Sequence, residues 1–495
     1  MTENGHHERN QGRIDGSFAS SVLSTQYSVL AGRNVLLMGL GSRQGGVGVA
    51  RYLVESGANV RVTDMRSEEQ LRASLDELVD LRIAFTLGRH DEEDFRWADI
   101  IVRNPAVPRE SPWLALARDL GKPIEMEMTL FFRACPAPII GVTGTKGKTT
   151  TTTLLHAMLR EKWPAAVLAG NMGRSALMQL SAIQPDVPVA LELSSFQLEA
   201  LDEHGLSPHV AVITNISPDH LDRYPSYEDY VRTKGAIARW QRRGVDHLVV
   251  NPGDERVFQD IAQDAPGQWI LFGSQPRPGW NPDLWIEDGR FIGVWSYAGQ
   301  IDLGPVDALR LPGEHSQLNA LAAAGAALAV GVSPEEIRRA IAGFDGVPHR
   351  MEHVATVGGI DFVNDTAATA PAAAVAALRA FAGRPIVAIT GGFDKQLPME
   401  PLADELVRHA SRVVLLEGSV TGTIEALLRE RRFDAIDGPL TSLDSAVRRA
   451  AAIAEPGGVV LLSPGCASFG MFRDEFHRGE MFREAVMALS QGDDA

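Results

Sequence analysis

The sequence has few cysteines, no long apolar run and no excess of positive charge. Its 495 residues include only two cysteines, Cys135 and Cys466, too few for a disulfide framework or a four-thiolate zinc site. No apolar run reaches the roughly 18 residues that a membrane-spanning helix needs, and residues 1–26 lack the apolar core of a secretory signal. The formal charge is −16, from 47 Lys+Arg against 63 Asp+Glu, which argues against broad binding to nucleic acid or anionic membranes. A soluble cytoplasmic protein is expected.

What is present is an ordinary globular composition, with 45% hydrophobic and 22% charged residues, and a length that suggests about three domains. Short apolar runs alternate with helical stretches, as in α/β folds with parallel sheets. The predicted strands are 35–38, 59–63, 99–102, 138–142, 187–193, 210–214, 247–250, 385–390, 413–416 and 458–462. The predicted helices are 47–55, 152–160, 317–330, 372–381, 399–409 and 442–454. The alanine-rich stretch 317–330 predicts close helix packing, and the glycines at 343 and 346 mark a boundary.

The first glycine-rich turn, Gly39-x-Gly41, follows a predicted strand and precedes a helix, and the next strand ends at Asp64. The strict dinucleotide fingerprint fails because Gln44 stands where its third glycine belongs. Two interpretations stay open, a tight turn alone and a nucleotide-diphosphate site at the helix N-terminus. In the second, Asp64 would accept hydrogen bonds from a ribose or base and Arg66 would pair with an anion.

The second glycine-rich turn, Gly144-Thr-Lys-Gly147-Lys148-Thr149-Thr150, is a stronger signal. Its backbone amides can cradle phosphates, Lys148 can reach the terminal phosphates, and the Thr149 hydroxyl can bind Mg²⁺. The turn departs from the standard P-loop because Val142 stands where that motif has its first glycine. Since a strand precedes it and a helix follows, the segment predicts ATP binding.

Polar groups also follow two other predicted strands. Glu192 ends an apolar strand, where parallel sheets bind ligands, and is a candidate Mg²⁺ ligand beside Thr149, although an isolated strand-terminal acid is more often structural. His220 lies in the cluster Asp219-His220-Leu-Asp222-Arg223 and is a candidate ligand or acid/base group. Considered alone, Lys234 is typical of a solvated helix lysine.

These segments resemble the Mur ligase family, in particular its members that add glutamate, over residues 33 to 488. The segments that carry the resemblance are Gly-Thr-Lys-Gly-Lys-Thr-Thr (144–150), Gly-Asn-Met-Gly (170–173), Leu-Glu-Leu-Ser-Ser-Phe-Gln-Leu-Glu (191–199), Asn-Ile-Ser-Pro-Asp-His-Leu-Asp-Arg (215–223), Gly-Glu-His (313–315), Pro-His-Arg (348–350) and Leu-Ser-Pro-Gly-Cys-Ala-Ser (462–468). So many segments in the family's order make the match specific.

The resemblance implies an ATP-dependent amide ligase that joins D-glutamate to UDP-N-acetylmuramoyl-L-alanine through an acyl phosphate, in peptidoglycan precursor synthesis. It implies a tail over 1–28 and three α/β domains. These are a Rossmann-like UDP-substrate domain over 29–134, a central P-loop-type ATP and Mg²⁺ domain over 135–346, and a Rossmann-like amino-acid domain over 347–495. Its cofactors would be ATP, two Mg²⁺ ions and CO₂, the last as a carbamate on Lys234. No feature requires a protein partner, and a monomer is expected.

The resemblance also assigns residues. The catalytic set would be Lys148, Glu192, His220 and Lys234, and the metal ligands Thr149, Glu192, His220 and Lys234. ATP would contact Gly144, Thr145, Lys146, Gly147, Lys148, Thr149, Thr150 and, across the domain interface, Asn319, Arg350 and Asp365. The UDP-substrate would contact Gly41, Asp64, Arg66, Asn104 and Asn171, and the amino acid Thr369, Lys395 and Ser468.

Three departures from the family pattern lie near the expected glutamate and nucleotide contacts. Ala367 replaces the lysine of the usual Asp-Ser-Lys-Ala-Thr-Asn segment, Ser316 replaces the asparagine that commonly follows Gly-Glu-His, and Glu475-Phe476 reverses the common order of aromatic and acid. The alternatives are the same ligation with L-glutamate, another Mur or folylpolyglutamate-type ligase, a non-catalytic nucleotide-binding relative, and an NAD-dependent dehydrogenase. The last rests on Gly39-x-Gly41 alone and leaves Gly-Lys-Thr without a role.

Overall fold

The computed structural model describes residues 30–41, 44–171, 175–219, 223–276, 281–295, 298–311, 313–394, 397–468 and 470–492. The tail predicted over 1–28 lies outside these ranges. The chain divides into two compact units, Met1–Leu309 with Glu314–Phe344, and Arg310–Gly313 with Asp345–Ala495. Among the described residues, no helix combines the length and apolar character needed to cross a membrane.

The first sheet of the first unit is parallel, with strand order β3-β2-β1-β4-β5. Its elements are β1 Asn34–Met38, α1 Gln44–Glu55, β2 Asn59–Asp64, α2 Glu68–Asp76, β3 Ile83–Leu87, α3 Glu92–Trp97, β4 Ile100–Arg103, α4 Pro112–Asp119, β5 Ile124–Glu125 and α5 Glu127–Ala134. Side chains of β1 alternate between two cores. Val35 and Leu37 join one, and Leu36 and Met38 join the other, as a strand covered on both faces requires.

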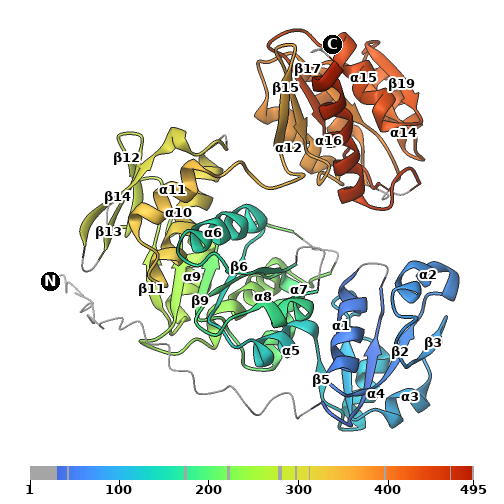
Figure 1. The fold of residues 1–495 in the computed structure, drawn as a ribbon, viewed down its shortest axis with the longest axis vertical. Helices are drawn as coiled ribbons and strands as arrows, with labels where there is room; N and C mark the ends of the chain where they lie inside the picture. The colour runs from blue at the N-terminus through green and yellow to red at the C-terminus, as the bar shows by residue number, and fades with distance from the viewer. Residues whose placement is uncertain are drawn as a thin grey trace. The chain divides into compact units, whose positions relative to one another are not determined.

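The second sheet of this unit is also parallel, with order β11-β10-β9-β6-β8-β7. Its elements are β6 Ile139–Thr143, α6 Lys148–Lys162, β7 Leu168–Gly170, β8 Val189–Glu192, α7 Ser195–Glu203, β9 Val210–Ile213, α8 Tyr227–Arg239, β10 His247–Val250, α9 Glu255–Asp260 and β11 Gln268–Leu271. Figure 1 shows α6 on one side of this sheet and α7 and α8 on the other. Because β6, β8 and β9 are parallel neighbours, the loops that leave their carboxyl ends lie at one edge of the sheet, where parallel sheets bind ligands.

A small antiparallel sheet and two helices complete the first unit. The strands are β12 Leu284–Glu287, β13 Arg290–Trp295 and β14 Gly299–Pro305, and the helices α10 Glu314–Ala329 and α11 Pro334–Ala342. Helix α10 packs on α6, and its alanines at 320, 322–324, 326, 327 and 329 are buried. The close packing predicted for the alanine-rich stretch is thus confirmed, whereas the antiparallel sheet was absent from the sequence-based prediction.

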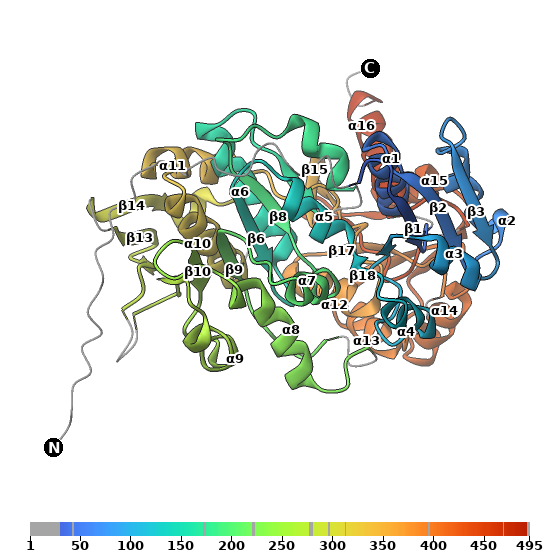
Figure 2. The same ribbon diagram turned by 90° about the horizontal axis from the view of Figure 1, so that it is seen from below.

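The second unit holds one mixed sheet with order β15-β16-β20-β17-β18-β19, in which only the β15–β16 pair is antiparallel. Its elements are β15 Glu352–Val357, β16 Ile360–Asn364, α12 Pro371–Ala380, β17 Ile386–Thr390, α13 Glu400–His409, β18 Ala410–Leu416, α14 Thr421–Glu430, β19 Ile436–Leu440, α15 Leu443–Ile453, β20 Val459–Leu462 and α16 Glu475–Gly492. Figure 2 gives a second view of both units. One core packs under α12, α13 and α14, and the other under α15 and α16.

Candidate functional site

The second glycine-rich turn connects β6 to α6 and carries most of the predicted ATP contacts. Lys148 is the first residue of α6, and its ammonium donates to the carbonyls of Gly144, at 2.9 Å, and Thr145, at 3.0 Å. Lys146 is exposed, and Gly147, Thr149 and Thr150 are half-buried. The turn therefore brings a cation to the N-terminus of a helix, the arrangement that binds phosphate.

Two glycines of this turn leave no room for a side chain. A Cβ on Gly144 would lie 1.9 Å from Thr214 Oγ1, and one on Gly147 would lie 2.4 Å from Asn319 Oδ1. Gly147 also has a left-handed φ of 82°, which side chains tolerate poorly. Asn319 comes from α10, so the turn is packed against a second predicted nucleotide residue that lies 172 positions away in the chain.

Substitution of Gly147 with alanine should weaken ATP binding. Left-handed backbone at a non-glycine residue costs about 1–3 kcal/mol, and the added Cβ must also displace Asn319. We expect the KM for ATP to rise roughly tenfold or more, measured in a steady-state phosphate-release assay. The double variant Gly147→Ala/Asn319→Ala removes the clash but keeps the strained φ, and it is compared with Asn319→Ala because Asn319 is itself a proposed ATP contact. A double variant with the same KM as Asn319→Ala would contradict the backbone argument.

Thr145 connects the turn to two other segments of the site. Its hydroxyl donates to Ser217 O at 3.1 Å and accepts from Ser217 N at 3.0 Å, so the Tyr230 hydroxyl, 3.1 Å away, is left as a second donor to it. Residues 214–219 follow β9 and Tyr230 lies on α8. Sequence reasoning missed Tyr230, although its position one helical turn before Lys234 was a usable signal.

Lys234 is buried in α8, with its Nζ 2.8 Å from Gly144 O and 3.5 Å from Thr143 Oγ1. Its ammonium also lies 4.9 Å from the centre of the Tyr230 ring. Burial, and to a smaller extent the charge of Lys148, hold the pKa of Lys234 well below its ordinary value. The lysine is therefore part of the site rather than the solvated residue that its isolated sequence context indicates.

Glu192 ends β8 and is almost fully buried. Its Oε1 accepts from Asn171 Nδ2 at 3.0 Å, and its Oε2 has no hydrogen-bond partner among the described residues. A buried carboxylate oxygen without a partner is costly, and carboxylate oxygen is a preferred Mg²⁺ ligand. Thr149 supplies a hydroxyl on the same sheet edge, so these residues fit a magnesium ion. His220 lies outside the described residues.

The first glycine-rich turn is organised by Asp64. Its Oδ2 accepts from the amides of Leu40, at 2.9 Å, and Gly41, at 3.1 Å, and its Oδ1 accepts from Arg66 N at 2.9 Å. Asn104, after β4, lies beside the turn, because a Cβ on Gly39 would be 3.0 Å from that of Asn104. The structure thus gathers the predicted UDP-substrate residues of this domain, and it gives the Asp64 carboxylate the role of holding the turn.

In the second unit, two loops bring the predicted residues to one sheet edge. Asp365 follows β16 and Ser463 follows the neighbouring strand β20, and Ser463 Oγ donates to Asp365 Oδ2 at 2.8 Å. The loops meet again where Gly465 N donates to Ala368 O at 2.9 Å. Thr369 and Ser468 lie in these loops, with Thr369 half-buried and Ser468 buried. Lys395 lies outside the described residues.

Asp365 should make the stability of the protein depend on pH. Burial raises the pKa of Asp365 to about 6, against weaker opposing effects of its hydrogen bonds with Ser463 and Met351. The charged form therefore destabilises the fold: the penalty is absent below about pH 4, grows as the pH rises and is complete above about pH 6. Asp365→Asn should raise the free energy of unfolding by about 3 kcal/mol at pH 7.5 and by almost nothing at pH 4. Urea denaturation at both pH values measures this, and an equal gain at both would contradict it.

Three family models match the chain in order. They are the Mur ligase MurD-like N-terminal domain over residues 33–125, the Mur ligase middle domain over 142–327, and the Mur ligase glutamate ligase domain over 349–466. The chain belongs to the Mur ligase family. Its three α/β domains are those of that family, as the sequence predicted.

Individual Mur ligases are similar over nearly the whole chain. The UDP-N-acetylmuramoylalanine--D-glutamate ligase of Roseiflexus sp. (strain RS-1) is 50% identical over 471 residues, which cover 93% of this chain and 100% of that protein. The protein of the same name from Symbiobacterium thermophilum is 38% identical, with 90% and 97% covered.

Solved Mur ligase structures share the fold. The UDP-N-acetylmuramate-alanine ligase MurC from Thermotoga maritima has a TM-score of 0.58 at 21% identity, with 92% of this chain and 99% of that chain covered. MurF from Acinetobacter baumannii has a TM-score of 0.54 at 18% identity, with 95% and 93% covered.

Proposed function

We propose that this Mur ligase joins D-glutamate to UDP-N-acetylmuramoyl-L-alanine with hydrolysis of ATP, in the synthesis of peptidoglycan precursors. The observation that carries the proposal is the 50% identity, over the full length of the relative, to a protein named for this reaction. The ATP turn supports it, together with the buried Lys234 and the buried Glu192, whose Oε2 has no hydrogen-bond partner among the described residues.

The residues suit the chemistry that such a ligase must perform. Joining a carboxylate to an amine in water is uphill, so the L-alanine carboxylate first attacks the γ-phosphate of ATP and becomes an acyl phosphate. Lys148 and the N-terminus of α6 would hold the phosphates and offset the charge of two approaching anions. The amine of glutamate then attacks the acyl carbon, and the tetrahedral intermediate expels phosphate.

Mur ligases use ATP and Mg²⁺, and we propose two magnesium sites here. Bound Mg²⁺ would supply charge neutralisation at the transferred phosphoryl group. Thr149, Glu192 and His220 would provide its protein ligands. We further propose that Lys234 carries a carbamate formed with CO₂, because an ammonium cannot bind a cation whereas a carbamate offers anionic oxygens. A lowered Lys234 pKa favours the neutral amine that reacts with CO₂.

The remaining contacts are proposed from the family pattern and the local geometry. ATP would contact residues 144–150, Asn319, Arg350 and Asp365, the UDP-substrate would contact Gly41, Asp64, Arg66, Asn104 and Asn171, and the amino acid would contact Thr369, Lys395 and Ser468. Asp64 would act largely by shaping the turn that its carboxylate holds. We also propose domain limits at 29–134, 135–346 and 347–495, and a cytoplasmic monomer.

The amino acid is the part of the proposal that most needs an experiment. Phosphate release should be measured with ATP, Mg²⁺ and UDP-N-acetylmuramoyl-L-alanine, in the presence of D-glutamate, L-glutamate or neither, with the product identified by mass. Release with D-glutamate alone supports the proposal and shows that Ala367 is tolerated. Release with L-glutamate alone keeps the mechanism and changes the product. No release, while ATP still binds, leaves a nucleotide-binding relative.

A further inference from the structure

The backbone on both sides of Arg350 is strained. His349 has a φ of 67° and Met351 a φ of 46°, and neither is glycine. A non-glycine residue in this region persists only where its surroundings hold it there, and such residues gather at functional sites. Arg350 itself is exposed, and its backbone amide donates to Val347 O at 3.1 Å. Contacts with its surroundings must therefore hold this short segment in place.

Met351 N donates to Asp365 Oδ1 at 3.2 Å and Ala367 N donates to His349 O at 3.0 Å, so the backbone of the segment is tied on both sides of Arg350. The side-chain anchor is His349, which is only 9% exposed. Its Nε2 lies 3.1 Å from Glu480 Oε1, and its Nδ1 lies 3.2 Å from Asn364 Nδ2. The Phe476 ring stands edge-on to the imidazole, with ring centres 5.7 Å apart. We call Asn364, Phe476, Gly479 and Glu480 the His349 socket.

The hydrogen bonds of the socket fix where the imidazole carries its proton. Asn364 Nδ2 lies near two other acceptors, Glu352 Oε2 at 3.1 Å and Gly479 O at 3.2 Å, which identifies this atom as the amide nitrogen. The two hydrogens of this nitrogen are shared among the two oxygens and His349 Nδ1, which accepts because an amide nitrogen does not, and His349 Nε2 is left to donate to Glu480. The backbone amide of His349 is held as well, since it donates to Glu352 Oε2 at 2.8 Å.

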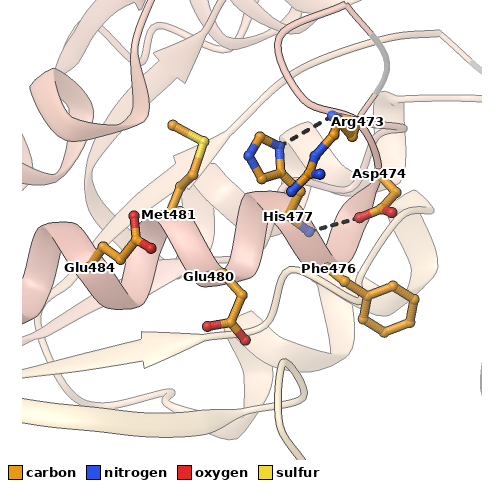
Figure 3. Close-up of a pocket in the computed structure, with 7 residues that line it drawn as sticks. All are labelled: Arg473, Asp474, Phe476, His477, Glu480, Met481 and Glu484. Carbon is orange, nitrogen blue, oxygen red and sulfur yellow. Dashed lines mark hydrogen bonds between the residues drawn. The ribbon is translucent and has the colours of Figure 1, made fainter.

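The socket also accounts for two features of the α16 sequence. A Cβ on Gly479 would lie 2.2 Å from His349 Nδ1, so only glycine leaves space for the imidazole. Phe476 holds the position at which this chain reverses the family's common order of aromatic and acid, and the reversal places the aromatic ring against His349. Figure 3 shows Phe476 and Glu480 projecting to the same side of α16.

We propose that His349 is a positioning residue for nucleotide binding: locked in its socket, it fixes the strained backbone that presents Arg350 to ATP. The inference rests on the proposed contact between Arg350 and ATP. It assigns a role to the histidine of Pro348-His349-Arg350 and to the Phe476, Gly479 and Glu480 positions of α16, none of which needs to touch the substrate.

Native-state trypsin cleavage of the full chain tests whether His349 holds Arg350, without reference to ATP. In His349→Ala, cleavage after Arg350 should be about tenfold faster than in wild type, because the segment opens locally more often. Cleavage after Arg310, which is exposed, is the internal reference, and His353→Ala, at an exposed histidine outside the socket, is the matched control. Equal cleavage after Arg350 in wild type and His349→Ala, or an equal rise at both sites, would overturn the proposal.

A kinetic cycle tests the link to ATP. His349→Ala should raise the KM for ATP about tenfold and leave the KM for the UDP-substrate within twofold. The KM for ATP of His349→Ala/Arg350→Ala should be no higher than that of Arg350→Ala, because the histidine acts through the arginine. Additive effects would overturn the proposal. If Arg350→Ala alone leaves the KM for ATP unchanged, the proposed ATP contact fails, and the cleavage rates still decide whether His349 holds the segment.

A milder pair of variants guards against a failure to fold. Glu480 is half-exposed, so its replacement should be tolerated. Glu480→Gln keeps an oxygen that accepts from His349 Nε2 and should match wild type in both experiments. Glu480→Ala removes the acceptor and should move both measurements in the direction of His349→Ala. A reversed order of these two variants would count against the proposal.

Discussion

Lys234→Met will lower turnover by about three orders of magnitude while the protein stays folded. Methionine fills nearly the same buried space, but it cannot become a carbamate and so supplies no anionic ligand to a metal. Losing one metal contact to the transferred phosphoryl group removes several kcal/mol of transition-state stabilisation, and about 1.4 kcal/mol corresponds to a factor of ten in rate. The measurement is D-glutamate-dependent phosphate release at saturating substrates.

A control variant and the removal of CO₂ test the cause of the loss of turnover in Lys234→Met. Lys162→Met, at an exposed lysine of α6, should retain wild-type turnover. Removal of CO₂ and bicarbonate from the buffer should slow the wild type, and their return should restore it, while Lys234→Met should respond to neither. A Lys234→Met enzyme with more than a tenth of wild-type turnover would contradict a carbamate at this position.

Glu192→Gln is expected to produce a loss of 100- to 1,000-fold, by the same estimate of several kcal/mol per metal contact. Glutamine has the shape of glutamate and can still accept from Asn171 through its oxygen. It replaces the buried Oε2, which has no partner in the described part of the chain, with an amide that cannot bind a cation. The Mg²⁺ concentration that gives half-maximal activity should therefore also rise.

The control for this variant is Asp186→Asn, which removes an exposed acid a few residues before β8 and should change neither turnover nor the magnesium requirement. The unfolding midpoint of Glu192→Gln should be equal to or higher than that of the wild type, because the buried carboxylate oxygen that has no hydrogen-bond partner among the described residues is removed. Loss of turnover with an unchanged magnesium requirement would contradict a ligand role for Glu192.

The sequence predicts most of the framework of the site, because each element there has a local signal. Apolar runs that end in glycine or an acid identify β1, β6 and β8. The helix predicted over 152–160 lacks the last two residues of α6 and its first turn, where Thr149 and Thr150 have low helix propensity. That turn forms nevertheless, since Gly147 starts the helix in a left-handed conformation and α10 packs alongside.

The contacts that the sequence does not predict are those between distant segments. Nothing local indicates that Asn319 lies against Gly147 or that Tyr230 donates to Thr145. The role of Asp64 in holding its own turn also depends on the distance between two strand ends, which a sequence pattern leaves open. The sequence does not predict the antiparallel sheet β12–β14 for a similar reason, because its short strands pair only through tertiary context.

The central claim is that the γ-phosphate of ATP activates the substrate carboxylate before D-glutamate attacks it. The most direct test labels both carboxylate oxygens of the L-alanyl group with ¹⁸O and follows the label during turnover with D-glutamate. The account predicts that each phosphate released carries one ¹⁸O atom and that the ligated product keeps the other. Phosphate without ¹⁸O would show that water, and not the carboxylate, attacks ATP, and it would contradict the account.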